Sequence, residues 1–293
     1  MVSMQNFTTA SLQTMQGDNM SKTLYISDLD GTLMRQDQTI SSYTVDTINR
    51  LVAKGMCFSF ATARSLVTAG PITAGITVEI PAVVYNGAFI IDKQTGKILL
   101  SHYFASHERE EIFQVLQEAN IHPIVYSYTE GVEKFTYCRD LCNEETRAFI
   151  DTKKGDVRDN PVREPDELKQ GDIFYFTCIG EEEKLWLAYQ RLKGKYICLY
   201  QTDIYSGAKW LEIIPKEATK ANAVLQLKEM LGCDRIVAFG DAKNDIPLFQ
   251  IADECYAVAN AVPELKEIST GVVLSNEEDG VARWLAENGS WQY

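Results

Sequence analysis

The 293-residue chain contains no apolar run that approaches the roughly 20 residues needed for a helix to cross a bilayer. Its first twenty residues carry no Lys or Arg and no continuous apolar core, so they match neither a secretory signal nor a transit peptide. We expect residues 1–20 to form a disordered polar tail or a start-site extension. Together these absences predict a cytoplasmic protein that does not work at a membrane.

Histidine and paired cysteine are also scarce. The three histidines, His102, His107 and His122, are too few and too scattered to form a metal-ligand set. The seven cysteines are odd in number and contain no Cys-x-x-Cys, and the spacing of Cys138 and Cys142 is a poor zinc signature. This pattern indicates reduced thiols rather than a disulfide framework or a zinc site.

The chain has fewer basic than acidic residues. The 28 Lys and Arg against 41 Asp and Glu give a formal net charge of -13, with an isoelectric point near 4.8. Such a balance argues against nucleic acid or an anionic membrane as the main partner. A small phosphorylated metabolite is still compatible with it, because a bound divalent cation can reverse the local sign of the charge.

Strand-like and helix-like segments alternate at both ends of the chain. Strands separated by helices favour right-handed crossovers and therefore a parallel sheet. The length allows one large domain or two moderate ones. The expected strands are at 24–27, 57–61, 81–85, 236–239, 255–258 and 272–274, and the expected helices are at 44–54, 220–231, 245–252 and 279–287.

The middle of the chain does not show this regular alternation of strands and helices. A hairpin around residues 93–96, together with further strand and helix pieces, predicts an inserted α+β domain with an antiparallel sheet. Residues 151–172 are rich in charge, Pro and Gly and are expected to form a solvated surface loop, which would carry Lys153, Lys154 and Arg158. Tyr126 and Trp210 are expected to pack the cap and core, and stacking on a base or sugar where the domains meet stays open as the alternative. The predicted division is a core made of 21–87 and 202–293, interrupted by a cap at 88–201.

Two carboxylates, Asp28 and Asp30, directly follow the apolar run 24–26. Asp and Gly are common in turns, so this pair alone is a moderate signal. An uncompensated buried charge is costly, however, and such pairs are usually metal-bound or functional. A second acidic cluster at 240–245 follows another apolar run, 235–239. The carboxyl ends of parallel strands meet at one edge of a sheet, where ligands bind in such folds.

Two further segments fit the same edge. Thr62 and Arg64 follow the expected strand at 57–61, and Lys220 opens an expected helix. Carboxylates can hold Mg²⁺, which prefers oxygen ligands, and they can also attack phosphorus as nucleophiles. A metal ion and a lysine would neutralise a phosphoryl group that carboxylates would otherwise repel. The residues therefore favour phosphoryl-transfer chemistry.

At this point the chain resembles the haloacid dehalogenase superfamily, and within it the Cof-like phosphatases, whose α/β cap is inserted after the third core strand. The resemblance implies a Rossmann-like parallel-sheet core of α/β class with an inserted α+β cap. It covers nearly everything from Lys22 onward. The matching motifs, in the family's order and spacing, are Asp28–Leu33, Ala61–Arg64, Tyr85–Ala88, Leu211–Pro215 through Lys220, and Phe239–Asp245.

The resemblance implies catalytic roles. Asp28 would be the nucleophile that forms an acyl phosphate. Asp30 would protonate the leaving alcohol and then activate water. Thr62 and Lys220 would stabilise the transferring phosphoryl group. Relatives usually carry a glycine on each side of the lysine segment, where this chain has Glu217 and Ala221; Lys216 is the less favoured alternative to Lys220.

The resemblance also implies a cofactor and substrate contacts. Mg²⁺ would be held by the Asp28 carboxylate, the Asp30 backbone carbonyl and Asp241, with Asp245 acting through water or on Lys220. The residues implied to bind substrate are Arg64, Asn86, Gly87 and Asn244.

The predicted function is a Mg²⁺-dependent phosphatase that hydrolyses a small phosphate monoester, such as a sugar phosphate, through an aspartyl-phosphate. Two alternatives stay open: a phosphomutase of the phosphomannomutase type, and a catalytically silent protein that binds a phosphorylated ligand. Dehalogenase chemistry is disfavoured, because relatives that perform it lack the acid corresponding to Asp30.

Overall fold

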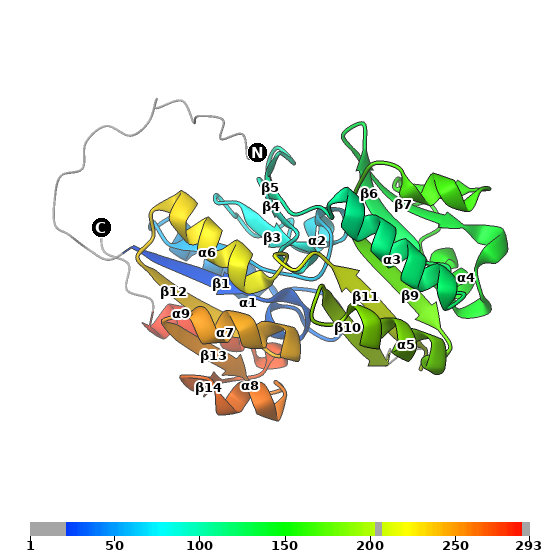
Figure 1. Cartoon of the computed structure of the whole chain (residues 1–293). Helices are drawn as coiled ribbons and strands as arrows, with labels where there is room; N and C mark the ends of the chain where they lie inside the picture. The colour runs from blue at the N-terminus through cyan, green and yellow to red at the C-terminus, as the bar shows by residue number, and fades with distance from the viewer. Residues whose placement is uncertain (1–21, 203–206, 289–293) are drawn as a thin grey trace.

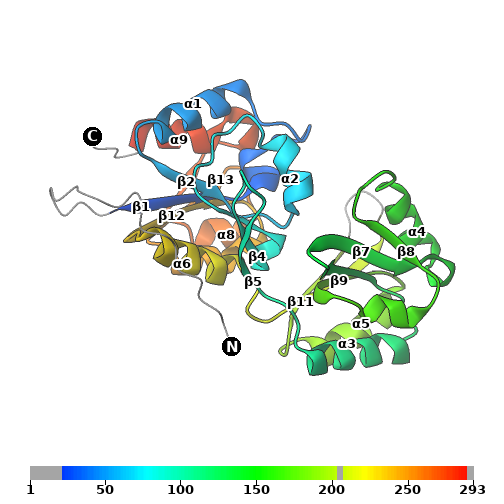
Figure 2. The same cartoon turned by 90° about the horizontal axis from the view of Figure 1, so that it is seen from above.

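The computed structural model describes residues 22–202 and 207–288, which form two lobes joined side by side (Figures 1 and 2). The expected tail at 1–20 lies outside the described residues. No helix within the described ranges is long and apolar enough to cross a membrane.

The first lobe is built on a five-stranded parallel sheet in the order β14-β13-β12-β1-β2. Its central strands are almost wholly buried, as expected for a parallel sheet covered on both faces. This confirms the predicted α/β core. The strands are β1 (Thr23–Ser27), β2 (Cys57–Phe60), β12 (Arg235–Gly240), β13 (Glu254–Val258) and β14 (Gly271–Val273).

Helices cover this sheet on both sides, with α1 and α9 together on one side and α6 on the other (Figure 2). Helix α1 begins after Ser41, whose side chain accepts a hydrogen bond from the Thr44 N–H, and it buries Ile48 and Leu51 against the core. The helices of this lobe are α1 (Ser42–Val52), α2 (Leu66–Ile72), α6 (Lys220–Leu231), α7 (Ile246–Ile251), α8 (Pro263–Glu267) and α9 (Gly280–Asn288).

A small antiparallel sheet connects the lobes. Strand β3 (Ala82–Val84) joins the core through a parallel bridge between Val83 and Ala61, and it pairs with β4 (Phe89–Ile91), which pairs in turn with β5 (Ile98–Ser101). The chain then passes into the second lobe.

The second lobe, which we call the cap, contains a six-stranded sheet in the order β10-β11-β9-β6-β7-β8, antiparallel except for the parallel pair β7 and β8. Helices α3 and α5 pack on one face of this sheet, and α4 lies near the opposite face. The elements are β6 (Ile124–Thr129), β7 (Val132–Cys138), β8 (Asp159–Val162), β9 (Asp172–Gly180), β10 (Ile197–Thr202), β11 (Lys209–Ile214), α3 (Ser106–Glu118), α4 (Glu144–Asp151) and α5 (Glu182–Leu192).

Some expectations differ from this arrangement. The segment 151–172 is not a plain loop, because it contains β8 and a 3-10 turn at Pro165–Lys169. Strands β4 and β5 fall inside the expected cap at 88–201 yet pair with β3, and β11 falls inside the expected core at 202–293 yet pairs with β9 and β10. Hydrogen bonding across the sheets, rather than local composition, assigns these strands.

Candidate active site

Asp28 lies directly after β1, at the carboxyl edge of the core sheet. Its N–H donates to the Phe239 carbonyl of β12 at 2.9 Å, and the residue is 4% exposed. Gly31, with a φ of +73°, turns the chain back over this edge, and a Cβ there would lie 2.3 Å from Asp241 Oδ2. The Thr32 hydroxyl donates to Asp241 Oδ1 at 3.1 Å. The two distant acidic motifs therefore meet.

Lys220 lies between them. It is the first residue of α6, which is capped by the Thr219 side chain, and it is 2% exposed. Its Nζ donates to Asp28 Oδ1 at 2.6 Å and to Asp245 Oδ1 at 2.7 Å. Burial alone would lower the pKa of Lys220, but the carboxylates of Asp245 and Asp28 outweigh that effect and raise it. Lys216, the alternative, is exposed.

The acidic cluster carries more negative charge than Lys220 balances. Carboxylate oxygens of Asp28, Asp241 and Asp245 lie within 4.8 Å of one another, so three carboxylates face one ammonium and two negative charges remain. Burial raises the pKa of Asp28 well above its ordinary value, and burial together with Asp245 raises the pKa of Asp241 to about 6. Oxygen ligands with this charge excess fit a divalent cation such as Mg²⁺.

Asp245 also organises the backbone of its own loop. Its Oδ2 accepts hydrogen bonds from the N–H groups of Asp241 and Ala242, both at 3.1 Å, and its side chain is fully buried. One carboxylate thus holds Lys220 and shapes the turn that carries Asp241. Asp30, in contrast, is not part of this cluster, and its carboxylate forms an ion pair with Arg64.

Arg64 forms a bidentate ion pair with Asp30. Its Nε and Nη2 donate to the Asp30 carboxylate at distances from 2.6 to 3.0 Å. The sequence predicted Arg64 as a substrate contact and Asp30 as an acid, and the structure places both at the mouth of the site, in contact with each other.

The remaining predicted residues line the same edge. Thr62 is fully buried after β2, and its carbonyl accepts from the Asn86 N–H at 2.9 Å. Asn244 Nδ2 donates to Asn86 Oδ1 at 3.3 Å. Gly87 packs against the start of α6, where a Cβ would lie 2.2 Å from the Thr219 carbonyl oxygen. All of the sequence-predicted site residues are therefore brought to one end of the core sheet.

The close approach of Gly87 gives a test of this packing. We expect Gly87→Ala to destabilise the protein by more than about 2 kcal/mol and to reduce activity. A residue with a Cβ is strained at a φ of +102°, and the 2.2 Å contact with the Thr219 carbonyl oxygen is relieved only if the start of α6, which carries Lys220, moves. Gly96→Ala is the matched control, since Gly96 has a φ of +71° but no heavy atom within 4 Å of the added Cβ. Equal thermal unfolding midpoints for the two variants would contradict this packing.

Comparison with known proteins agrees with this geometry. Residues 25–285 match the haloacid dehalogenase-like hydrolase family. The chain belongs to this family. The 5-amino-6-(5-phospho-D-ribitylamino)uracil phosphatase YwtE of Bacillus subtilis is 30% identical over 294 residues, covering 91% of this chain and 98% of that protein. YitU of the same organism, which bears the same activity name, is 26% identical over 276 residues, covering 89% of this chain and 95% of YitU.

A solved structure shows the same fold. TM0651 from Thermotoga maritima superposes with a TM-score of 0.75 at 25% identity, covering 92% of this chain and 98% of that chain. The resemblance to haloacid dehalogenase-like hydrolases is thus confirmed. Among the expected activities, phosphatase is the one that the relatives' names support.

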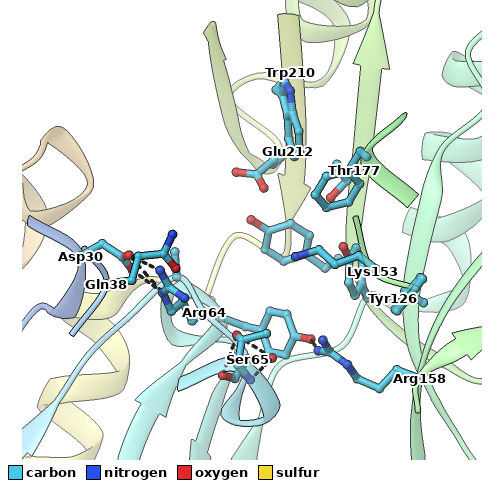
Figure 3. A pocket seen from close by; sticks show the side chains of 16 residues that line it. Asp30, Gln38, Arg64, Ser65, Tyr126, Lys153, Arg158, Thr177, Trp210 and Glu212 are labelled. Carbon is cyan, nitrogen blue, oxygen red and sulfur yellow. Dashed lines mark hydrogen bonds and ion pairs between the residues drawn. The ribbon is translucent and has the colours of Figure 1, made fainter. Parts of the chain in front are cut away.

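In this hydrolase, two cavities open between core and cap. One of about 840 Å³ contains Asp28, Asp30 and Asp241, and the other, of about 430 Å³, extends from Asp30 and Arg64 to the cap sheet (Figure 3). Figure 3 shows Glu212, Trp210 and Thr177 on the cap side, facing the core-side residues across the space. Apart from the stacking alternative for Tyr126 and Trp210, the sequence assigned no functional role to the cap side chains that line the second cavity. They are Tyr126, Phe135, Phe149, Lys153, Arg158, Tyr175, Thr177, Trp210 and Glu212.

The expectation that Arg158 is solvated is wrong. It is 5% exposed, and its guanidinium donates to Glu133 and Asp156 at 2.7 Å and to the Tyr85 hydroxyl at 2.9 Å. The Tyr85 hydroxyl in turn donates to Glu133. Because Tyr85 begins the 3-10 turn Tyr85–Gly87 on the core side, this network links the cap to the active-site edge.

Proposed function

We propose that the protein is a cytoplasmic, Mg²⁺-dependent phosphatase that hydrolyses a small phosphate monoester through an aspartyl-phosphate on Asp28. The observation that carries this proposal is the buried contact of Lys220 with Asp28 and Asp245, with Asp241 close by. That arrangement presents a nucleophilic carboxylate to a substrate, and a divalent cation bound at the cluster would allow the site to accept a dianion.

The chain's own residues account for both half-reactions. Lys220 holds Asp28 Oδ1, which leaves Oδ2 to attack phosphorus while the bond from phosphorus to the leaving alcohol breaks. Asp30 gives a proton to the departing oxygen. In the second half, Asp30 takes a proton from water, the water oxygen attacks the phosphoryl group on Asp28, and phosphate is released.

Asp28, Asp241 and the Asp30 backbone carbonyl would hold Mg²⁺, with Asp245 behind them. When bound, the ion supplies positive charge next to the phosphoryl oxygens. Thr62 and the ammonium of Lys220 supply further hydrogen bonds on the protein side. The charge excess of the cluster supports this assignment.

Arg64 has a part in this scheme. A guanidinium binds phosphate as well as carboxylate through paired N–H donors. Arrival of the substrate dianion therefore offers Arg64 a second partner, which would loosen its hold on Asp30 and free that side chain to approach the leaving oxygen.

The relatives' names support a phosphorylated alcohol as substrate. YwtE and YitU are named for a phosphorylated ribitylamino-uracil. That compound is the first specific substrate to try, beside sugar phosphates. Formation of an isomeric hexose phosphate without free phosphate would instead identify a mutase.

Metal removal tests the proposal. We expect hydrolysis of a generic aryl phosphate to stop when Mg²⁺ is removed with a chelator and to return when it is added back. Asp241→Asn is expected to raise the Mg²⁺ concentration for half-maximal activity by about tenfold to a hundredfold or more, because it removes a direct anionic ligand. Asp46→Asn, an exposed change on α1, is the matched control. Full activity in the presence of chelator would contradict the proposal.

A further inference from the structure

The face of the cap sheet that borders the cavity carries polar and aromatic side chains. Successive side chains of a strand point to opposite faces, and on β11 Leu211 and Ile213 pack into the core formed with α3 and α5. Trp210 and Glu212 therefore face the other way, into the cavity of about 430 Å³ (Figure 3). Thr177 lies opposite Glu212 on β9 and lines the same cavity.

Glu212 is the distinctive group of this wall. It is half-buried, it accepts a hydrogen bond from Tyr175, and within residues 22–202 and 207–288 no Lys or Arg forms an ion pair with it. Burial raises the pKa of Glu212 to about 7, against the opposing effect of the Tyr175 hydrogen bond. A carboxyl group held in this way gains from any ligand that donates hydrogen bonds to it.

The positive groups nearby are engaged elsewhere. Arg158 is neutralised by Glu133 and Asp156. The ammonium of Lys153 lies over the ring of Phe149, 5.1 Å from its centroid, and burial lowers its pKa. Arg64, which lines the same cavity, is paired with Asp30, so among the described residues Glu212 remains the cap-wall carboxylate that no cation pairs with.

Aromatic side chains complete the wall. Tyr126, Tyr175 and Trp210 line the cavity, and Trp210 stands edge-on to Phe149 with the ring centroids 4.9 Å apart. Among the described residues, the Trp210 indole N–H has no hydrogen-bond partner. Such rings pack well against the carbon face of a sugar or against a planar heterocycle.

We propose that this face of the cap, centred on Glu212 and Trp210, is the subsite for the leaving group, and that it selects an uncharged, donor-rich alcohol, such as a polyol or an amino-substituted ring. In its ionised form, Glu212 accepts hydrogen bonds from hydroxyl or amino groups and repels a leaving group that bears a second anion. The inference rests on the proposed phosphatase function, and it names the substrate class for the same site.

The test compares two substrates of opposite kind. We would measure kcat/KM with Mg²⁺ for D-ribitol 5-phosphate, whose leaving group is a neutral polyol, and for 3-phosphoglycerate, whose leaving group carries a carboxylate. The wild-type protein is expected to prefer the polyol. Glu212→Gln is expected to reduce that preference by about tenfold or more, because it weakens the charged hydrogen bonds and removes the repulsion.

Two further variants sharpen the comparison. Glu183→Gln makes the same chemical change on the exposed side of α5 and is expected to leave the preference unaltered. Glu212→Asp keeps the charge but shortens the side chain, so it should still exclude 3-phosphoglycerate while losing activity on the polyol. Thermal unfolding of each variant, read beside the rates, identifies any that fails to fold.

The possible results distinguish failure of the proposed subsite from failure of the proposed phosphatase function. Two results overturn the subsite, provided that aryl phosphate is still hydrolysed. One is a wild-type preference for 3-phosphoglycerate, and the other is a ratio of kcat/KM for the two substrates that is the same in the wild type and in folded Glu212 variants. Absence of Mg²⁺-dependent aryl phosphate hydrolysis in the wild type overturns the proposed function, and the subsite with it.

Discussion

Asp28→Asn is expected to lower kcat for phosphate release by at least about 10⁴-fold, the scale seen when a covalent nucleophile is removed. The amide that replaces the carboxylate does not form an acyl phosphate. The fold should survive, because Lys220 keeps Asp245 as an ion-pair partner at 2.7 Å. Single-turnover release of phosphate from an aryl phosphate would measure the loss.

The control for this change is Asp46→Asn, which alters an exposed aspartate on α1 and should retain wild-type rates. Circular dichroism and thermal unfolding would establish that both variants are folded. Wild-type-level turnover by a folded Asp28→Asn protein would remove Asp28 from the role of nucleophile.

Lys220→Met is expected to damage both stability and catalysis. The substitution keeps the aliphatic bulk but leaves Asp28 and Asp245 without their shared cation, and breaking a buried pair costs about 3–5 kcal/mol. Loss of a donor aimed at the transferring group should also lower kcat by roughly 10²- to 10³-fold. Mg²⁺ should recover part of the stability, because it binds the folded site and offsets the same charge excess.

Lys216→Met is the matched control, since Lys216 lies four residues earlier and is exposed. Its unfolding midpoint and its rate should equal those of the wild type. If Lys216→Met abolished activity while Lys220→Met kept it, the lysine assignment would be reversed. Thermal unfolding midpoints with and without Mg²⁺, measured together with steady-state rates, would compare the two lysine variants with the wild type.

The positions of Asp28, Lys220 and Asp241 could be predicted because their signals are local. Each follows an apolar strand or opens a helix, and the carboxyl ends of parallel strands meet by geometry. Gly31 follows Asp30 directly and turns the chain with a positive φ, and the structure adds that a Cβ there would clash with Asp241. The core sheet was predictable for the same reason: its hydrophobic runs are continuous and separated by helices.

The burial of Arg158 was not predictable, because only Asp156 among its partners is a neighbour in the chain and the other two are distant. Glu133 is 25 residues away and Tyr85 is 73 residues away. Nothing in the local composition of a charged segment distinguishes a buried arginine from a solvated one. Strand β8 was missed for a related reason: it contains Pro161 and lies at the sheet edge, where only its pairing with β7 defines it.

Glu212 was partly predictable from the sequence. It lies inside the apolar run Leu211–Ile214, so a carboxylate between buried neighbours was visible in the sequence. Its alternation with Leu211 and Ile213 also indicated a different face. The sequence did not show which residues neighbour Glu212 on the cap wall, Tyr175 and Thr177, or which core-side residues face it, among them Asp30 and Arg64.

The central claim is that Asp28 carries the phosphoryl group, and trapping that group tests it most directly. Asp30→Asn protein, whose second half-reaction should be slow, would be mixed with an aryl phosphate and Mg²⁺, quenched in acid, digested and analysed by mass spectrometry. We predict that the peptide containing Asp28 gains the mass of one phosphoryl group and that Asp28→Asn abolishes this gain. A phosphoryl group on another residue, or continued turnover with none on Asp28, would contradict the account.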